Sequence, residues 1–277
     1  MSANTLVVED FSALGQISIL AALNVLQAFD IETAALPTTI LSTQTEGFGQ
    51  PARLETKDWL KKASEHWQSL TNVYLKGAIV GYLGSADLIK PISQLLMNVK
   101  SPILIDPVMA DRGALYPGLA SDYPQQMRHF CQLADVITPN WTELCLLTGH
   151  SKPLKADLST FKQLLRELQD QGIRARVVAT GVHIEQSENT LVYDGHDVKA
   201  ITNKQYPGHF YGAGDTFAAL LLGNILTNPN GLDNLYRDVV DSCQQLSISI
   251  QETSTYPDTD RRYGLKLRNL LQLITKN

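Results

Sequence analysis

Cysteine is scarce in this chain, and the few cysteines present form no motif. Cys131, Cys145 and Cys243 lie far apart, with no pair at CxxC spacing. This number and spacing neither build a disulfide framework nor supply a set of zinc ligands. All three thiols fit a reducing compartment.

Long apolar runs are also missing. Nowhere do about 18 apolar residues follow one another, so the sequence predicts no membrane-spanning helix. Residues 1–5 lack the positive segment and the apolar stretch that open a secretory signal. We therefore expect a cytoplasmic protein that has no membrane partner.

Clusters of basic residues are absent as well. The net charge is -5, and the Lys and Arg residues are scattered along the chain. Affinity for nucleic acid rests mainly on clustered cations that neutralise phosphates. This composition argues against a nucleic-acid partner, so we expect a small-molecule substrate.

What the sequence does contain is an alternation of short apolar runs with longer amphipathic stretches. Each run is followed by a polar or Gly-containing loop, which is typical of parallel strands covered on both faces. The expected strands are residues 6–8, 33–36, 78–80, 103–105, 136–137 and 177–179. The expected helices include residues 16–29, residues 57–70 with Thr56 as cap, a helix capped by Ser85, and residues 216–227.

After Thr180 the pattern changes. Residues 190–193 and 198–202 flank Asp194-Gly195, a dipeptide that is typical of hairpin turns. An antiparallel edge on a parallel sheet is common, so we expect a hairpin at one edge. The tail over residues 232–273 predicts further helices.

These elements together define the expected fold class. An α/β sheet with helices on both faces can be buried around one core in a chain of 277 residues. The sequence therefore predicts a doubly wound, mostly parallel α/β fold, in which residues 1–277 form a single domain.

Polar segments follow several of the expected strands. In an open α/β sheet, ligands bind beyond the carboxyl ends of the strands. Because those ends meet at one edge, we expect four polar segments to form a single site. The segments are Asp106-Pro107-Val108-Met109, Thr138-Pro139-Asn140-Trp141-Thr142-Glu143, Thr180-Gly181 and Gly212-Ala213-Gly214-Asp215.

The segment Gly212-Ala213-Gly214-Asp215 precedes an expected helix. Small residues let the backbone approach a ligand closely, and the unpaired N–H groups and dipole of the helix attract phosphate. A carboxylate at the end of such a loop, here Asp215, can take the proton from an attacking hydroxyl. The alternative is a Gly-rich turn with Asp215 as a helix cap. No Gly-Lys-Ser/Thr follows, so this is not a Walker sequence.

Asn140 and Glu143 are three residues apart at the start of an expected helix, so both can face one direction. Their oxygens suit water-mediated binding of Mg²⁺, which keeps several waters and takes few protein ligands. The alternative, which the local pattern favours, is a capping box with Asn140 as the N-cap. Asp106, before Pro107, is either a turn former or a carboxylate on the metal and phosphate side.

Five segments, in this order, carry a resemblance to a known family. They are Leu41-Ser42-Thr43-Gln44-Thr45, Gly81-Tyr82-Leu83-Gly84-Ser85, Asp106-Pro107-Val108-Met109, Thr138-Pro139-Asn140 with Glu143, and Gly212-Ala213-Gly214-Asp215. From about Val8 to Leu222 the chain resembles the pyridoxal/pyridoxamine kinase branch of the ribokinase-like superfamily. The resemblance implies Mg²⁺ with ATP as phosphoryl donor and the 5′-hydroxyl of a vitamin B6 vitamer as acceptor.

The resemblance also implies roles for individual residues. Asp215 would be the general base, and Gly212, Ala213 and Gly214 would form the anion hole. Metal and phosphates would be organised by Asp106, Asn140 and Glu143, with Asp106 and Glu143 on the metal. The nucleotide side would be lined by Thr138, Thr180 and Gly181. The pyridine ring would be held by Asp10, Ser12, Thr45 and Glu46, with Tyr82 packed against it.

Two alternatives stay open. A hydroxymethylpyrimidine kinase of the same fold would share every phosphate-side residue and differ only in the acceptor pocket. A catalytically inactive protein that binds the vitamer belongs to a different class, although a carrier has no need of a base such as Asp215. The resemblance implies a homodimer, and it leaves a requirement for a monovalent cation open.

Overall fold

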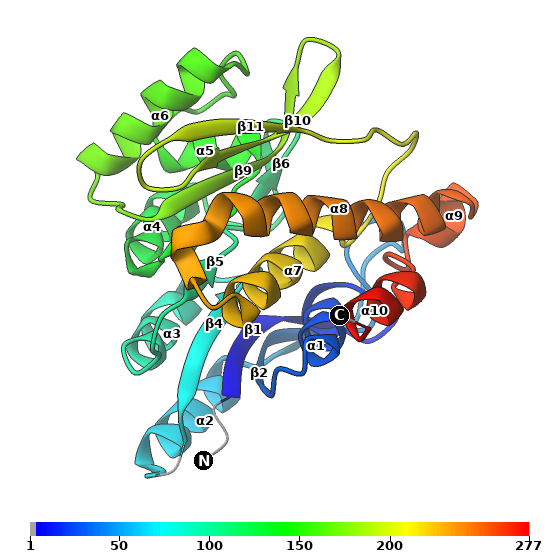
Figure 1. The fold of residues 1–277 in the computed structure, drawn as a ribbon. Coiled ribbons are helices and arrows are strands. Elements are labelled where there is room, and N and C mark those ends of the chain that lie inside the picture. The colour runs from blue at the N-terminus through cyan, green and yellow to red at the C-terminus, as the bar shows by residue number, and fades with distance from the viewer. Residues whose placement is uncertain (1–3, 72, 277) are drawn as a thin grey trace.

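A mostly parallel sheet runs through the molecule (Figure 1). The computed structural model describes residues 4–71 and 73–276, and over these residues the sheet has nine strands in the order β11-β10-β9-β8-β5-β4-β1-β2-β3. The strands are β1 (Asn4–Ser12), β2 (Thr33–Leu41), β3 (Arg53–Glu55), β4 (Leu75–Val80), β5 (Ile103–Ile105), β8 (Val136–Ile137), β9 (Arg176–Ile184), β10 (Ser187–Tyr193) and β11 (Val198–Thr202). The six central strands pair in parallel, whereas β3, β10 and β11 are antiparallel edges.

All six strands expected from apolar runs are present, and the edge hairpin forms between β10 and β11. One expectation about a loop is wrong. Thr180 and Gly181 do not follow a strand, because β9 continues to Ile184. The continuation is held by β10, which pairs antiparallel with β9 out to Ile184. A local apolar pattern does not reveal this pairing, because its partner lies beyond the turn.

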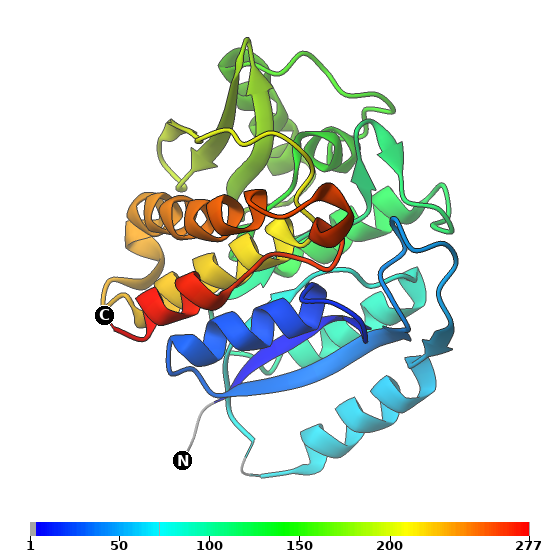
Figure 2. The same ribbon diagram turned by 90° about the vertical axis from the view of Figure 1, so that its right-hand side faces the viewer.

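Helices cover both faces of the sheet, as expected for a doubly wound fold. One face carries α1 (Ser18–Ala28), α7 (Ala213–Thr227), α8 (Leu235–Ser254) and α10 (Arg268–Ile274), which Figure 2 shows stacked on the near side. The other face carries α2 (Lys57–Ser69), α3 (Ile89–Leu96), α4 (Tyr123–Phe130), α5 (Trp141–Leu147) and α6 (Leu158–Asp170). Because strand side chains alternate, Leu6 and Val8 pack into the second layer and Val7 into the first.

Short elements complete the chain. They are η1 (Ala86–Leu88), β6 (Ala110–Asp111), β7 (Ala114–Leu115), η2 (Cys131–Leu133), η3 (Gly231–Asn234) and α9 (Asp258–Arg261). The strands β6 and β7 form a small hairpin directly after the Asp106-Pro107-Val108-Met109 segment. This hairpin therefore stands beside the carboxyl edge of the main sheet.

The two expected caps, Ser85 and Thr56, precede helical segments, but one of them works differently. Ser85 accepts a hydrogen bond from the backbone of Asp87, as a cap does. Thr56 precedes α2, yet its side chain accepts no capping bond. Its hydroxyl instead donates to the carbonyls of Pro37 (2.7 Å) and Thr38 (2.6 Å). Thr56 therefore ties α2 to β2 rather than satisfying the helix end.

The tail is helical, as predicted, and it returns to the start of the chain. Gln16 donates its N–H to the carbonyl of Tyr263 at 2.6 Å and forms a bridge with Gly264. The backbones approach so closely that a Cβ on Gly264 would lie 2.3 Å from the Gln16 carbonyl oxygen. Only glycine fits here, and its positive φ of 93° requires it as well. The C-terminal segment thus supports the loop that precedes α1.

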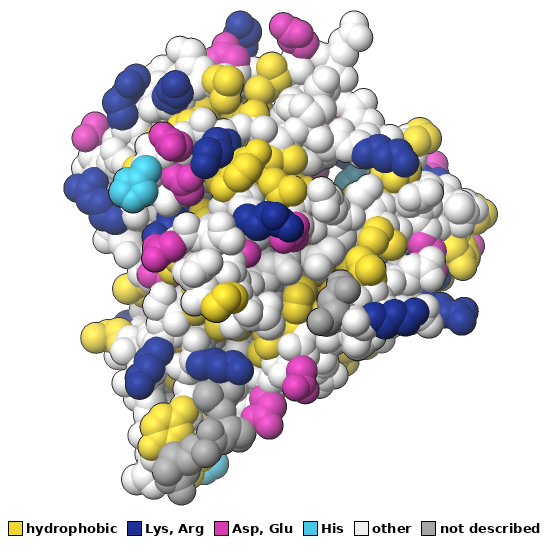
Figure 3. All heavy atoms as spheres, in the orientation of Figure 1, with side chains coloured by type: hydrophobic (Ala, Val, Ile, Leu, Met, Phe, Trp, Pro, Cys, Tyr) yellow, Lys and Arg dark blue, Asp and Glu magenta, His cyan; other side chains and the backbone are white. Residues whose placement is uncertain are grey.

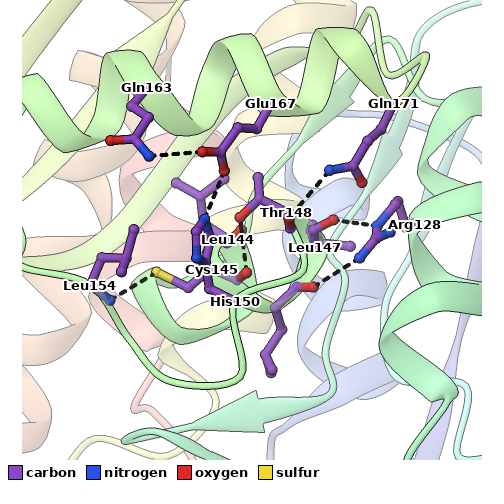
Figure 4. A network of polar contacts seen from close by, with 11 residues as sticks. Arg128, Leu144, Cys145, Leu147, Thr148, His150, Leu154, Gln163, Glu167 and Gln171 are labelled. Atoms are coloured by element: carbon purple, nitrogen blue, oxygen red, sulfur yellow. Dashed lines mark hydrogen bonds and ion pairs between the residues drawn. The ribbon is translucent and has the colours of Figure 1, made fainter.

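A polar network holds the turn between α5 and α6, and we call it the α5–α6 corner (Figure 4). Its polar side chains come from Arg128, Thr148, His150, Gln163, Glu167 and Gln171. His150 Nε2 lies 2.8 Å from Glu167 Oε2, and Gln163 donates to Glu167 Oε1 at 2.8 Å. Arg128 donates to the carbonyl of Leu147. Each charge in this corner has a partner.

The surface agrees with the scattered charge of the sequence. On the face drawn in Figure 3, basic and acidic side chains alternate and gather into no large patch of one sign. Over residues 4–71 and 73–276, no helix is both long enough and apolar enough to cross a membrane.

Candidate active site

Three neighbouring parallel strands, β4, β5 and β8, end in register at the carboxyl edge of the sheet, beside β1, which continues to Ser12. Val8 pairs with Val80, Val80 with Ile105, and Ile105 with Ile137. The backbone ladder continues for one more residue on β4, β5 and β8, through N–H to carbonyl distances of 2.8 to 3.2 Å. The next residues are Glu9, Gly81, Asp106 and Thr138, which we call the edge row. The row joins two of the expected polar segments and adds Glu9, which the motifs did not indicate.

The edge row faces the start of α7. Two residues earlier on the same strands, Val7, Ile79, Leu104 and Val136 belong to the core beneath α1 and α7. Because side chains repeat every second residue, the edge row points to that same side. A Cβ on Gly214 would lie 3.9 Å from Asp106 Oδ2. The first turn of α7 therefore lies directly over Asp106.

The sequence predicts that this helix begins at Thr216, but α7 begins at Ala213, and Gly212 is its N-cap. Gly212 has a φ of 75°, and a Cβ there would come within 2.8 Å of Ile17 Cγ2. Both facts require glycine. Gly212, Ala213 and Gly214 offer no side chain larger than a methyl group, so the N–H groups of the first turn are open to an anion.

Asp215 lies in the first turn of α7 and is held by another segment. Its Oδ2 accepts a hydrogen bond from the backbone N–H of Ser18, the first residue of α1, at 2.7 Å. Ser18 is a non-glycine residue with a φ of 48°, a conformation that is sparsely populated and often found at functional sites. Sequence reasoning missed Ser18, because the contact uses its backbone and spans 197 residues.

The surroundings of Asp215 raise its pKa to about 6. Burial is the main cause, the charge of Asp10 adds to it, and the N–H of Ser18 opposes it. A carboxylate with such a pKa is ionised at neutral pH and is still a better proton acceptor than a free aspartate. The arrangement suits a general base.

Asn140 and Glu143 form the capping box that the local pattern favoured. Asn140 Oδ1 accepts from the Glu143 N–H at 3.0 Å, and Glu143 Oε2 accepts from the Asn140 N–H at 2.9 Å. Glu143 does more than cap, because its Oε1 accepts from the N–H of Met109 at 3.0 Å. Asn140 Nδ2 in turn donates to the carbonyl of Ala110 at 2.7 Å. The pair therefore fixes the segment after Asp106 against α5.

Asp106 and Glu143 are buried, and their pKa values are raised. Burial is the main cause for both groups. The neighbouring charges of Glu143 and Asp215 also raise the pKa of Asp106 well above its usual range, and the pKa of Glu143 reaches about 7. None of the ion pairs among the described residues includes either carboxylate. Two buried carboxylates with no basic partner suit a divalent cation.

The described residues do not form a ready-made metal cage. No group of three or more His, Cys, Asp or Glu side chains converges as a set of metal ligands within the ranges 4–71 and 73–276. Mg²⁺ does not need such a cage, because it is often held by one or two carboxylates, by waters and by substrate phosphates. Asp106 and Glu143 fit this mode of binding.

The expected ring-binding residues Asp10, Ser12 and Tyr82 cluster at the ends of β1 and β4. Ser12 Oγ donates to Asp10 Oδ2 at 2.9 Å, and both residues are buried. Burial raises the pKa of Asp10, and hydrogen bonds from the hydroxyls of Ser18 and Ser12 partly oppose this rise. Beside Tyr82 stands Arg53, and atoms of both lie 3.2 Å from the Cβ position of Gly84. Arg53 was missed because it comes from the short exposed strand β3.

Thr45 and Glu46 lie in the loop between β2 and β3, at the rim of this cluster. Thr45 is exposed. Glu46 is exposed, and its Oε2 lies 3.8 Å from His209 Nε2. His209 Nδ1 is 3.0 Å from Arg112 Nη2 at the tip of the β6–β7 hairpin. Three loops that are distant in sequence thus meet above the edge row.

The residues expected on the nucleotide side come together around β8 and β9. Thr138 is buried in the edge row. Thr180 donates its N–H to the carbonyl of Pro139 at 3.0 Å and bridges Asn140, although it lies within a strand. Gly181 follows it, exposed and with a φ of 59°. The extended β9 therefore brings the two residues beside Asn140.

Comparison with known proteins gives two matches in sequence. A family model described as phosphomethylpyrimidine kinase matches residues 18–233. The putative pyridoxal kinase of Caenorhabditis elegans is 30 % identical over 229 residues, which cover 75 % of this chain and 68 % of that protein. The matched range of the family model includes the edge row from Gly81 onward and the whole of α7.

Two solved structures are similar over nearly the whole chain. The pyridoxal kinase of Lactobacillus plantarum is 36 % identical, with a TM-score of 0.89 over 100 % of this chain and 98 % of that chain. A putative phosphomethylpyrimidine kinase of Bacteroides thetaiotaomicron, in a crystal form with pyridoxal, is 29 % identical, with a TM-score of 0.88. That match covers 99 % of this chain and 96 % of the other. The predicted fold class is thereby confirmed.

Proposed function

The chain belongs to the phosphomethylpyrimidine kinase family, and from this premise we propose that it uses ATP to phosphorylate the 5′-hydroxyl of pyridoxal, pyridoxamine or pyridoxine. Its similarity to pyridoxal kinases bears out the resemblance to the vitamin B6 kinases and the expectation of an ATP-dependent phosphotransferase. The observation that carries the proposal is the position of Asp215, in the first turn of α7 above the edge row.

Asp215 is proposed to be the general base. Its Oδ1 is not engaged by the bond from Ser18, which holds Oδ2. An acceptor hydroxyl placed beside Asp215 would lose its proton to the carboxylate as it attacks the γ-phosphoryl group. The N–H groups of residues 212–214 would then stabilise the charge on the transferred group. The base and the anion hole are thus one rigid unit, the start of α7.

ATP is proposed to lie along the carboxyl ends of β5, β8 and β9. Its contacts would come from Asp106, Thr138, Asn140, Glu143, Thr180 and Gly181. Asp106 and Glu143 would hold Mg²⁺, which when bound neutralises charge on the phosphates. Because Glu143 also accepts from Met109 and Asn140, its carboxylate is pre-oriented for this role.

The acceptor is proposed to lie on the other side of Asp215, at the ends of β1, β2 and β4. Asp10, Ser12, Thr45, Glu46 and Tyr82 would surround the pyridine ring. The crystal form of the Bacteroides thetaiotaomicron relative with pyridoxal supports a B6 vitamer as the acceptor. A hydroxymethylpyrimidine is the second candidate, because the family model and that same relative both carry the phosphomethylpyrimidine kinase description.

One assay separates these candidates. ADP formation is coupled to a spectroscopic readout at saturating Mg²⁺ and ATP, with pyridoxal, pyridoxamine, pyridoxine and hydroxymethylpyrimidine as acceptors. We expect the highest kcat/KM on a B6 vitamer. A higher kcat/KM on hydroxymethylpyrimidine would identify that second candidate as the acceptor. Tight vitamer binding without turnover would favour the inactive binding protein.

We also propose a homodimer, as the resemblance implies. The chain has a mass of 30.6 kDa, so light scattering after size-exclusion chromatography should report twice that value. A mass equal to one chain at micromolar concentration would exclude the dimer.

A further inference from the structure

Glu9 is a buried carboxylate to which the proposed reaction assigns no role. It lies within β1, three residues before the strand ends at Ser12, and is 2 % exposed. Its Oε2 is fully buried and has no hydrogen-bond partner within residues 4–71 and 73–276. None of the ion pairs among the described residues includes it. A buried charge without a partner is costly, so a group of this kind requires compensation from a ligand or a proton.

The direction of the Glu9 side chain is set by its neighbour Gly81. A Cβ on Gly81 would lie 2.9 Å from Glu9 Cγ and 3.1 Å from Glu9 Oε1. The side chain therefore extends from β1 across the open surface that Gly81 leaves on β4. The next strand is β5, which ends in Asp106. Glu9 thus reaches along the edge row toward Asp106, and Gly81 provides the space for it.

The charges around Glu9 are all of one sign. Burial raises the pKa of Glu9 well above its usual range, and the charges of Asp215, Asp10 and Asp106 raise it further. Each of these carboxylates lies at the carboxyl edge, on β1, after β5 or in the first turn of α7. A cation bound among them would relieve several repulsions at once.

We propose that Glu9 is a further carboxylate of the divalent-cation site, acting with Asp106 across Gly81. The inference rests on the proposed kinase function and adds a residue to it. The divalent cation of a nucleotide is held by few protein carboxylates, either directly or through its waters. Asp106 and Glu9 supply two such groups from either side of Gly81 in the edge row, and Oε1 of Glu9, which lies over Gly81, is the oxygen directed at the cation or its water.

The proposal is tested with Glu9→Gln, which keeps the size of the side chain and removes its charge. Mn²⁺ replaces Mg²⁺ as the probe, and free Mn²⁺ is measured by electron paramagnetic resonance, with the metal alone and with the metal plus ADP. We expect the affinity for Mn²⁺ in the presence of ADP to fall about 10- to 100-fold, as when metal-site partners are removed. An unchanged Mn²⁺ affinity in folded Glu9→Gln would overturn the proposal and indicate that Glu9 is simply held protonated.

A matched control is available at the other end of α7. Asp238 is also buried, and its Oδ2 also has no hydrogen-bond partner, but its Oδ1 accepts from Asn228 beyond the C-terminal end of α7. Asp238→Asn should leave Mn²⁺ binding unchanged. A similar loss of Mn²⁺ affinity in this control would show that removal of any buried charge acts indirectly, and the proposal would fail.

A second measurement keeps the test independent of turnover. Without nucleotide, Glu9→Gln should melt at a higher temperature than the wild type near pH 8, because it removes an uncompensated buried charge. The rise in melting temperature caused by Mn²⁺ and ADP should be smaller in the variant. If Glu9→Gln does not fold, Glu9→Asp keeps the charge but withdraws it by one methylene, and its Mn²⁺ affinity should fall by a smaller factor.

Failure of the inference is distinct from failure of the proposed function. A wild-type protein that binds Mn²⁺ and ADP through Glu9 but phosphorylates no vitamer would refute the acceptor and retain the cation site. If the wild type phosphorylates pyridoxal and Glu9→Gln binds Mn²⁺ equally well, the role of Glu9 in the cation site is refuted and the proposed function is retained.

Discussion

The carboxyl edge of the sheet and the α5–α6 corner hold their charges in opposite ways. At the edge, Glu9, Asp106 and Glu143 are buried and form no ion pair with any of the described residues. In the corner, Glu167 is paired with His150 and also accepts from Gln163 (Figure 4). Hydrogen bonds to the backbone hold side chains in both regions, so the difference lies in the electrostatics.

The difference indicates which region needs a ligand to compensate its charges. In the corner the charged groups are paired, so this network needs no ligand to compensate them, although the buried Oε1 of Gln171 has no hydrogen-bond partner among the described residues. A set of like charges lowers the stability of the empty protein and becomes favourable only when a cation or proton arrives, which is typical of functional sites. The pKa shifts follow the same division. Burial raises the pKa of Asp215 and Glu143, whereas Gln163 and His150 overcome partial burial and lower the pKa of Glu167.

The largest effect is expected from Asp215→Asn. Asn keeps the size and can still accept from the Ser18 N–H, but it cannot take a proton. We expect kcat on the best vitamer to fall by about 10² to 10⁴, with the fold and ATP binding retained. Steady-state kinetics and a nucleotide-binding titration measure this. Near-native turnover in a folded variant would show that Asp215 acts only as a helix cap.

The next effect concerns stability against pH. Asp215 and Glu143 have pKa values of about 6 and about 7 in the folded protein, above their usual 3.8 and 4.5. Because these values are raised, the stabilising contribution is fully present below the usual pKa and is lost as pH rises through 6 and 7. We expect the nucleotide-free protein to lose roughly 4 kcal/mol of unfolding free energy between pH 5 and pH 8 through these groups.

Urea unfolding of the wild type and of Asp215→Asn across this range measures the loss. The variant should lose less, because one of the titrating groups is gone. Equal pH dependence in the two proteins would mean that Asp215 does not titrate in this range. It would also erase the electrostatic contrast between the edge and the corner.

Glu143→Gln should have a smaller effect, on the Mg²⁺ requirement. Gln has one oxygen, so it cannot accept both from Asn140 and from Met109 as Glu143 does. We expect the half-saturating Mg²⁺ concentration to rise about tenfold. A Mg²⁺ titration of activity at fixed ATP measures it. An unchanged titration would leave Glu143 with the capping box alone.

The smallest effect is expected in the α5–α6 corner. Glu167→Gln removes the charge that faces His150, and the side chains of both residues remain partly exposed. Partly exposed ion pairs contribute little, so the unfolding free energy should fall by less than about 1 kcal/mol, with kcat and the Mg²⁺ requirement unchanged. A changed Mg²⁺ requirement would show that the corner is coupled to the site and would break the comparison.

The buried strands and the long helices could be predicted from the sequence, because a hydrophobic pattern records which side of an element is covered. The strand β3 could not, since Arg53, Leu54 and Glu55 are all exposed and leave no such pattern. The extension of β9 through Thr180 depends on pairing with β10, which is not local.

The site divides in the same way. Residues that follow a strand or open a helix, such as Asp106 and Asp215, are visible as motifs. Ser18 contributes a backbone N–H, and its residue type reveals nothing about that contact. Glu9 is visible only through its burial beside Gly81, which requires the register of β1 and β4. Sequence thus indicates side chains that act at element ends, and structure adds the groups that act through packing.

The bridge between Gln16 and Gly264 has a consequence for the synthesis of the protein. Ser18, two residues after this bridge, orients Asp215. The last motif ends at Asp215, so every motif is synthesised before the segment around Gly264. That later segment supports the loop that precedes α1. A chain that is cut before Tyr263 would keep each of these motifs and lose the contact that seats this loop. The presence of all the motifs in such a truncated chain would therefore not mean that the chain is active.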